Sequence, residues 1–597
     1  MDSPTAQPLA GTLIDVLVER ARGVTAGLPL FTALDSGGDP TDRVSAAALL
    51  GRVRAVAAAL RTVGAAGDRV VVPALPGLDF HAGFLGCLYA GMIAVPVPPL
   101  RTGARHRATV RNDRLQKILR DCAPVAVLVS TPEEAEDARR ADADAGAGPV
   151  PVPARIAVRQ PADQGTPGPA RTASDPAAVA LLQYTSGSTG DPRGVIVGHG
   201  SLVANQRAVQ DRCEIGPETT VVSWLPLFHD MGLCTGLVLP LVSGAAAVTM
   251  EPAAFVRDPR VWLRAIEAEE DVFAAAPDFA YELCVRRIPE AERAGTDLST
   301  WRVAANGSEP VKASTLRRFA EAFRPSFFRE EVFSPGYGLA ESTLIVTMGK
   351  PLFPAPVRHY ERAALAEGKA VPATPSAGTV ELVGCGTAVT GAAVRVVDPE
   401  TRRPLAERMV GEIWVDAPGN CAGYWRNEAG SAKVFGARTE GAAPGTEGTE
   451  GTEGTEGNHV RTGDLGFLEE GELFVTGRLK DVLIIGGENY FPQDVEAVAG
   501  EAHAAFAYQR AAAWPLDEER NGVAVVIETA ERDQEVLAGA VRAAGMAVAR
   551  ALPAPVSVFA VARNKVPRTT SGKIRRRACA QQVAAGQLRP LAQWSSR

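Results

Sequence analysis

The chain has 597 residues, of which 46% are hydrophobic and 22% are charged. This balance is ordinary for a globular protein and excludes a disordered one, and the length allows roughly four domains or fewer large ones. The net charge of -7, from 62 basic and 69 acidic residues, gives no basic footprint for nucleic acid. We therefore expect small molecules and proteins as partners, and no nucleic acid.

The N-terminal sequence MDSPTAQPLAG has neither a basic region nor an apolar core, so it does not predict a secretory signal. The eight cysteines show no metal-ligand spacing, which predicts reduced, mostly buried thiols and a cytoplasmic location. Residues 232–249 are uncharged and approach the length of a membrane span, but Pro240, Gly236 and Gly244 interrupt them. We expect a buried helix followed by a strand there, and no membrane span.

The first part of the chain alternates Ala-rich helical patterns, such as residues 44–63, with short apolar runs at 69–73, 93–97 and 125–129. This alternation predicts α/β layers. Residues from about 133 to 176 are rich in Ala, Asp, Gly and Pro, and we expect a long surface connection without a core of its own. The repeat GTEGTEGTEGTEG at 445–457 predicts a solvated loop, with a docking element as the alternative.

The segment VALLQYTSGSTGDPRGVIVGH, residues 179–199, has a strand, loop, strand pattern. Glycines in the loop let the backbone approach an anion closely, and hydroxyl and backbone N–H groups supply donors, as a phosphate cradle requires. The P-loop pattern GxxxxGK[ST] is absent, so a Ser/Gly-rich turn is the alternative. The candidate phosphate ligands are Thr185, Ser186, Gly187, Ser188, Thr189 and Gly190.

The sequence YTSGSTGDPRG resembles the signature loop of acyl-adenylate-forming (AMP-binding) enzymes. Further matches follow in the expected order: SWLPLFHDMGL, NGSEP, GYGLAES, RTGD, GRLKD and PRTTSGKIRRR, from about residue 180 to 577. The resemblance implies ATP and Mg²⁺ as cofactors. One departure is Arg193, where many relatives carry Lys; either cation can contact a phosphate, and Arg does so with a bidentate fork.

Attack of a carboxylate on the α-phosphate of ATP brings two anions together, so positioned positive charge should dominate catalysis. Lys573 follows Ser571 and Gly572 in a loop able to enter a cleft, and the resemblance gives it contact with the carboxylate and the α-phosphate. A solvated basic tail is the alternative, because three arginines follow. The resemblance makes Glu341 the Mg²⁺ ligand, with a glutamate at a helix start as the alternative.

The remaining nucleotide contacts also follow from the resemblance. Tyr337 offers a ring face for adenine, with a core tyrosine as the alternative. Asp464 can accept hydrogen bonds from both ribose hydroxyls and Arg478 is the second ribose contact; a structural salt bridge is the alternative for either. The other residues implied to bind ATP or AMP are Gly307, Ser308, Glu309, Gly338, Leu339 and Ala340.

His229 lies beside Asp230 in an aromatic and apolar setting and resembles the residue that borders the acyl pocket in relatives. We assign it substrate positioning, with a satisfied core histidine as the alternative. A metal ligand is not expected, because no second His or Cys stands at a metal-ligand spacing.

The resemblance implies an α/β fold with a large N-terminal multi-subdomain domain, residues 1–479, and a small mobile C-terminal α+β domain, residues 480–597. Lys480 would lie at the hinge, about which the small domain rotates between an adenylating and an acyl-transfer state. The sequence stops 24 residues after Lys573, so we expect the acyl carrier to be a separate protein.

Within the family the chain most resembles fatty acyl-AMP ligases, through LLQYTSGST, WLPLFHDMGL and NYFPQDVE. These enzymes pass the acyl group of a fatty acid to an acyl carrier protein or a polyketide or nonribosomal peptide synthase. Residues 354–380 resemble their extra insertion. The sequence GGEN before Tyr490 instead resembles acyl-CoA synthetases, which remain an alternative, as does an inactive nucleotide-binding scaffold. Acyl chain length, the identity of the carrier, the pathway and the oligomeric state do not follow from the sequence.

Overall fold

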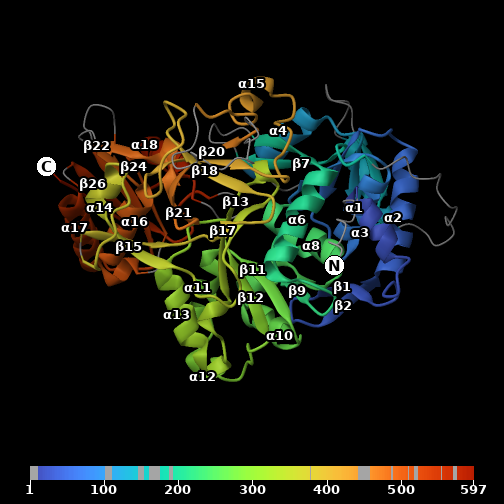
Figure 1. The fold of residues 1–597 in the computed structure, drawn as a ribbon, viewed down its shortest axis with the longest axis horizontal. Helices are drawn as coiled ribbons and strands as arrows, with labels where there is room; N and C mark the ends of the chain where they lie inside the picture. The colour runs from blue at the N-terminus through green and yellow to red at the C-terminus, as the bar shows by residue number, and fades with distance from the viewer. Residues whose placement is uncertain are drawn as a thin grey trace, which may run out of the picture.

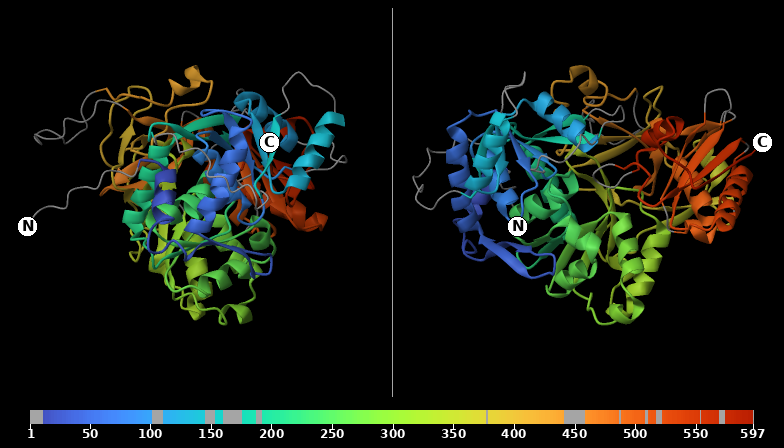
Figure 2. Two further views of the ribbon diagram at one scale, coloured as in Figure 1. Left: turned by 90° about the vertical axis from the view of Figure 1, so that its right-hand side faces the viewer. Right: turned by 180° about the vertical axis from the view of Figure 1, so that it is seen from behind.

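The computed structural model describes residues 11–100, 110–144, 153–159, 175–186, 192–376, 378–440, 458–485, 488–507, 510–516, 522–552, 554–568 and 574–596. Figure 1 shows mixed α/β structure with the C-terminal part, in red, gathered at one end of the longest axis. The view from behind in Figure 2 shows the same part beside a larger body that holds the rest of the chain. The predicted α/β class, with a large N-terminal and a small C-terminal part, is confirmed.

The largest sheet has nine strands in the order β17-β14-β13-β12-β11-β9-β10-β1-β2. Its inner strands are parallel, and all five residues of β11, VFAAA, are buried, as expected for a sheet covered on both faces. The strands are β1 (Pro29–Leu34), β2 (Pro40–Ser45), β9 (Thr220–Ser223), β10 (Ala246–Met250), β11 (Val272–Ala276), β12 (Trp301–Asn306), β13 (Phe333–Gly338), β14 (Ile345–Met348) and β17 (Thr387–Ala388).

A second sheet has six strands in the order β6-β5-β3-β4-β7-β8. Two of its strands have the bounds that the apolar runs predicted, and a third differs by one residue. The strands are β3 (Arg69–Pro73), β4 (Ile93–Val97), β5 (Ala126–Val129), β6 (Ala154–Ala157), β7 (Val179–Ser186) and β8 (Pro192–Gly198).

The expectation of a connection without a core at 133–176 is wrong for its first half. Helix α5 (Pro132–Asp144) buries Ala135, and β6 pairs in parallel with β5. Val158, directly after β6, is also buried in the main core. The run ARIA is too short to be recognised as a strand in a sequence rich in Pro and Gly. Pairing with β5 nevertheless satisfies its backbone groups and buries it.

Residues 232–249 form a buried helix followed by a strand, as predicted. The helix consists of α7 (Asp230–Leu233), a π-helical turn η1 (Cys234–Val238) and α8 (Leu239–Ser243), and it precedes β10. All eight cysteines are buried free thiols, which is also as predicted. Within the part of the chain that the structure describes, no helix is long and apolar enough to cross a membrane.

The remaining helices of the large part cover the faces of the two sheets or cap their ends. Ser45 begins one of them by accepting a hydrogen bond from the Ala48 backbone N–H at 3.3 Å. They are α1 (Leu13–Arg20), α2 (Ala46–Arg61), α3 (Asp79–Tyr89), α4 (Val110–Cys122), α6 (His199–Cys213), α9 (Pro252–Arg257), α10 (Arg260–Glu267), α11 (Asp278–Arg287), α12 (Glu290–Arg293), α13 (Ala313–Phe323), α15 (Glu428–Ser431) and the 3₁₀ turns η2 (Arg324–Ser326), η3 (Glu330–Val332) and η4 (Ala340–Ser342).

The segment 354–380 packs on an antiparallel sheet formed by β18 (Ala393–Val397), β19 (Gly411–Asp416), β20 (Val460–Glu469) and β21 (Glu472–Arg478). It comprises β15 (Val357–Glu361), α14 (Arg362–Ala366) and the start of β16 (Thr379–Val383), and its two strands pair with each other. We call residues 354–380 the insertion. The buried ring of Tyr360 packs on Phe467 and Phe474, with ring centroids 4.9 and 5.7 Å away.

Glu469, whose side chain is 2% exposed, fastens the insertion to this sheet. It accepts hydrogen bonds from the Tyr360 hydroxyl and the Arg408 guanidinium, and it forms an ion pair with Arg358. Burial opposes its ionisation, but these three partners hold the pKa of Glu469 below its usual range. The insertion is therefore firmly attached to the large part.

The C-terminal part has its own hydrophobic core, separate from the cores of the large part. Apolar side chains of its sheet pack against those of its longest helix, at whose start Asp533 accepts from the N–H groups of Glu535 and Val536. Its elements are η5 (Leu479–Asp481), β22 (Leu483–Ile485), β23 (Glu488–Tyr490), α16 (Pro492–Glu501), η6 (Ala504–Phe506), β24 (Ala511–Pro515), β25 (Val523–Thr529), α17 (Gln534–Ala551), β26 (Val556–Ala562), α18 (Arg576–Ala584) and β27 (Ala592–Ser595).

Candidate active site

The strand, loop, strand prediction at 179–199 is confirmed. β7 and β8 form an antiparallel hairpin in which Thr185 pairs with Arg193, so Arg193 lies across from the first residue of the candidate phosphate loop. Four of the predicted loop ligands and one side chain lie outside the described residues: Gly187, Ser188, Thr189, Gly190 and the side chain of Ser186.

Tyr184 fixes the strand that leads into this loop. Its hydroxyl donates a hydrogen bond to Asp121 of α4, and its carbonyl accepts one from Arg114 of the same helix at 3.3 Å. Burial and the Asp121 hydrogen bond raise the pKa of Tyr184, so its hydroxyl stays neutral. A Cβ on Gly194 would lie 3.0 Å from the Tyr184 ring, so the ring would have to shift slightly to admit any larger residue.

Three of the predicted nucleotide contacts meet where the end of β13 and the end of β21 reach the middle of β20. Tyr337, 8% exposed, donates its hydroxyl to Asp464 Oδ2 at 2.9 Å, and Arg478 donates Nε to Asp464 Oδ1 at 2.7 Å. Asp464 is the main cause of the raised pKa of Arg478. Tyr337 is thus a buried tyrosine, and Asp464 and Arg478 form an ion pair, as the structural alternatives for these residues proposed. Their nucleotide roles stay predictions.

The predicted adenine-binding backbone lies where β12 and β13 end side by side. A Cβ on Gly307 would come within 2.8 Å of the Gly336 carbonyl oxygen, and Ser308 has a positive φ of 71°. Glu309 accepts a hydrogen bond from the Phe279 N–H at 2.7 Å. A Cβ on Gly338 would lie 1.7 Å from the Leu344 carbonyl oxygen, so side chains are excluded at this edge.

Leu339 and Ala340 lead from β13 into η4, which presents Glu341. Glu341 Oε1 accepts a hydrogen bond from the Tyr424 hydroxyl at 2.7 Å. The guanidinium carbon of Arg193 lies 5.3 Å from the centroid of the Tyr424 ring. Arg193 and Glu341, the two predicted phosphate-site residues of opposite charge, thus both contact Tyr424. The sequence analysis missed this tyrosine. Its only signal there is an unexplained GYW between two motifs.

His229 begins the buried helix α7. Its N–H donates to the Pro226 carbonyl at 3.0 Å, and its carbonyl accepts from the Leu233 N–H at 2.8 Å. The ring of the preceding Phe228 lies 4.5 Å from the His229 ring, and Gln183 of β7 donates to the Phe228 carbonyl at 3.0 Å. His229 is thereby tied to the strand that carries Thr185, consistent with its predicted positioning role.

Lys480 lies in the turn η5 between the large and small parts, where burial and then the charge of Arg478 lower its pKa. Lys573 itself lies outside the described residues. The chain on either side of it is paired at Arg568 and Ile574. Three residues after Lys573, Arg576 pairs with Glu496 at 2.6 Å and with Asp481 of η5 at 3.4 Å.

Arg575, two residues after Lys573, interacts electrostatically with Arg114 of α4. After burial, the charge of Arg575 is the second cause of the lowered pKa of Arg114, and Arg114 is the residue that donates to the Tyr184 carbonyl. Arg575 of the small part therefore acts electrostatically on a residue that contacts the strand carrying Thr185.

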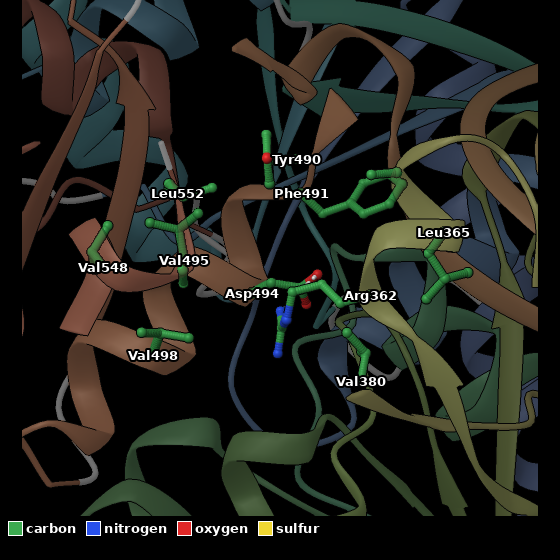
Figure 3. Close-up of a pocket in the computed structure, with 12 residues that line it drawn as sticks. Arg362, Leu365, Val380, Tyr490, Phe491, Asp494, Val495, Val498, Val548 and Leu552 are labelled. Carbon is green, nitrogen blue, oxygen red and sulfur yellow. Dashed lines mark ion pairs between the residues drawn. The ribbon is translucent and has the colours of Figure 1, made fainter. Parts of the chain in front are cut away.

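A pocket lies between the insertion and the small part (Figure 3). On one side Arg362 and Leu365 of α14 point toward it, and on the other side Asp494 and Val498 of α16 do so. Arg362 Nη1 lies 3.8 Å from Asp494 Oδ2. The complete lining is Arg362, Leu365, Ala366, Val380, Tyr490, Phe491, Asp494, Val495, Val498, Val548, Ala551 and Leu552.

Comparison with known proteins confirms the predicted family. The AMP-binding enzyme family matches residues 24–425. The long-chain-fatty-acid–AMP ligase FadD26 of Mycobacterium marinum is 38% identical over 92% of this chain and 93% of that protein. The medium-chain-fatty-acid–[acyl-carrier-protein] ligase JamA of Moorena producens is 33% identical over 99% of this chain and 98% of its own.

Solved structures agree over the whole fold. A fatty acid AMP ligase from Legionella pneumophila is 32% identical, covers 98% of both chains and has a TM-score of 0.73. A structure from a study of fatty acyl-adenylate ligases of E. coli and L. pneumophila is 30% identical, covers 98% of this chain and 100% of its own, and has a TM-score of 0.82. The chain therefore belongs to the AMP-binding enzyme family, and fatty acyl-AMP ligases resemble it over nearly its whole length.

Proposed function

We propose that the chain activates a fatty acid with ATP and passes the acyl group to the phosphopantetheine of a separate acyl carrier protein or polyketide synthase. The carboxylate oxygen attacks the α-phosphorus, an O–P bond forms, and pyrophosphate leaves. The carrier thiolate then attacks the acyl carbonyl, a C–S bond forms, and AMP leaves. The observation that carries this proposal is the convergence of Thr185, Glu341 and Arg193 beside the Tyr337–Asp464–Arg478 group.

The nucleotide would lie with its adenine near Tyr337 and Gly307 to Glu309, and with its ribose hydroxyls at Asp464. Arg193 and the loop after Thr185 would meet the phosphates, and Lys573 would enter from the small part. Positive charge placed this way offsets the repulsion between the attacking carboxylate and the phosphates. A neighbouring structure supports an acyl-adenylate as the intermediate: the L. pneumophila ligase, 32% identical with a TM-score of 0.70, is described in complex with acyl adenylate and pyrophosphate.

Glu341 fits a Mg²⁺ site. Its partner is a phenol, which is a neutral donor, so its carboxylate charge is not already paired at that contact. Among the described residues no group of three or more His, Cys, Asp or Glu side chains could hold a metal. Mg²⁺ characteristically needs only one or two carboxylates together with substrate phosphates and water. Bound there, it would supply positive charge to the phosphates.

We also propose the boundary between the parts at residues 479 and 480, in η5, and the insertion as the element that selects the acceptor. The insertion is fixed to the large part through Glu469, and it meets α16 of the small part at the pocket that both line. Rotation of the small part toward an acceptor must separate this contact. A carrier protein brings docking energy that free coenzyme A lacks, and that energy can stabilise a minor domain orientation.

The test is ATP–pyrophosphate exchange across a series of fatty acids of increasing chain length, with hydroxylamine trapping of the adenylate. Exchange that requires a fatty acid supports adenylation, and the chain-length profile defines the substrate. Acyl-carrier and acyl-CoA products are then measured from the same acid. Rapid acyl-CoA synthesis would identify an acyl-CoA synthetase instead, as GGEN at 486–489 suggests, and no exchange with any acid would identify an inactive scaffold.

A further inference from the structure

Residues 419–425, GNCAGYW, connect the two halves of the candidate phosphate site. On one side the strap, as we call these residues, bonds to β8: Trp425 N–H donates to the Gly194 carbonyl at 2.7 Å, and Ile196 N–H donates to the Gly423 carbonyl at 2.9 Å. On the other side it bonds to η4, where Cys421 N–H donates to the Glu341 carbonyl at 2.9 Å. The strap thus links the backbone of the strand that carries Arg193 to the backbone of Glu341.

The side chain of Tyr424 also contacts both halves of the candidate phosphate site. Its hydroxyl donates to the carboxylate of Glu341 at 2.7 Å, and its ring face receives the guanidinium of Arg193, with 5.3 Å from Cζ to the ring centroid. Tyr424 itself is 6% exposed, and its N–H donates to Ser431 Oγ at 2.8 Å. The ring is therefore held in place independently of the two charged residues.

The two contacts leave the binding capacity of both charged groups in place. The Arg193 guanidinium lies over the Tyr424 ring, and its hydrogen bond to the Tyr424 side chain opposes the burial-driven rise of the Tyr424 pKa. A guanidinium has five N–H donors, so donors remain for phosphate oxygens. A carboxylate that accepts one hydrogen bond retains lone pairs for a cation. A direct ion pair between Arg193 and Glu341 would instead use up both groups, and phosphates would have to break it before binding.

We infer that Tyr424 is a positioning residue of the proposed adenylation, one that keeps Arg193 and Glu341 from pairing with each other and aims both at the triphosphate. This inference rests on the proposed function, because it gives both residues their nucleotide contacts. In Tyr424→Phe the ring stays and the hydroxyl is lost, so Glu341 is released toward Arg193 and competes with the nucleotide for it.

The experiment measures ATP binding by calorimetry in the presence of EDTA, without fatty acid, so that neither metal nor turnover contributes. Tyr424→Phe is expected to weaken ATP binding about three- to tenfold, which corresponds to the net free energy of one typical hydrogen bond. In a Glu341→Gln background, where no ion pair can form, the same substitution is expected to change affinity less than about twofold. Tyr424→Leu, which also removes the ring face, is expected to lose more than Tyr424→Phe.

The matched control is Tyr360→Phe, which removes another buried tyrosine hydroxyl from a glutamate, Glu469, at the insertion; it should leave ATP affinity unchanged. Thermal melting checks that each variant is folded. Tyr424→His, which keeps a ring and an N–H donor, gives a second measurement and is expected to lose less ATP affinity than Tyr424→Leu.

Equal losses of ATP affinity from Tyr424→Phe in the wild-type and Glu341→Gln backgrounds, or no loss in Tyr424→Phe, overturn the inference alone. A wild-type protein that binds no ATP with or without Mg²⁺ overturns the proposed function as well.

Discussion

Arg362 Nη1 of the insertion lies 3.8 Å from Asp494 Oδ2 of α16, and this pair joins the large part to the small part across an otherwise apolar contact. Burial raises the pKa of Asp494 to about 6; Arg362 opposes the rise and Glu496 adds to it. The carboxyl therefore titrates near pH 6 at the surface between the insertion and the small part.

Asp494 should make the protein less stable as pH rises. A carboxyl whose pKa is raised on folding, here from 3.8 to about 6, stabilises the fold fully below about pH 4 and loses that contribution as pH rises through about 6. Asp494→Asn should remove this slope and stabilise the protein at pH 7.5 by the order of 1–3 kcal/mol. Calorimetric melting between pH 4.5 and 7.5 measures it. Glu501→Gln, exposed at the end of the same helix, should keep the slope, and an unchanged slope in Asp494→Asn would contradict the assignment.

Replacement of Lys573 by alanine should slow adenylation about a hundredfold or more, because a positioned charge that stabilises the transition state is lost. Transfer from preformed acyl-AMP should survive. Pyrophosphate exchange and single-turnover transfer separate the two steps. The control is Lys565→Ala, an exposed lysine shortly before the same loop; adenylation within about threefold of wild type, less than about 1 kcal/mol, would show that Lys573 has another role.

A charge placed in the contact between insertion and small part should relax acceptor selection. Val498→Asp places a carboxylate in the pocket that Leu365 and Val380 also line, which weakens the contact because an unpaired charge in an apolar setting is unfavourable. Acyl-CoA formation should rise relative to acyl-carrier formation, with adenylation within about twofold of wild type. Ala497→Asp, on the exposed face of the same helix, is the matched control. If Val498→Asp adenylates normally yet makes no acyl-CoA, the acceptor is selected elsewhere.

Gly232→Ala should displace His229. A Cβ at this position would lie 2.2 Å from the Pro226 carbonyl oxygen, the same oxygen that accepts the His229 N–H. Overpacking of this kind destabilises by about 1–3 kcal/mol, and we expect adenylation to fall along with stability. Gly539→Ala in α17, where a new Cβ would meet nothing within 4 Å, should be neutral or stabilising. Equal melting temperatures and rates for the two variants would contradict the role of this turn.

The parts of the site that the sequence predicted are those in which chemistry and geometry are local. Thr185 and Arg193 face each other because a short loop joins two strands, a pattern that is visible in the residues themselves. Tyr424 could not be found in that way, because its hydrogen bond to Glu341 spans 83 positions of the chain. The contact of Arg362 with Asp494 depends likewise on how two distant units pack.

The anchoring of the insertion by Glu469 determines which element moves. A segment held by the Tyr360 hydroxyl, the Arg358 guanidinium and a buried aromatic cluster is not a flap with an opening rate of its own. It is a fixed element of the large part, and the small part beside it has a separate core. A flap adds a kinetic step to catalysis, whereas a fixed insertion only biases the orientation that the small part adopts at rest. Acceptor choice in this protein would then be a matter of equilibrium between domain orientations rather than of gating speed.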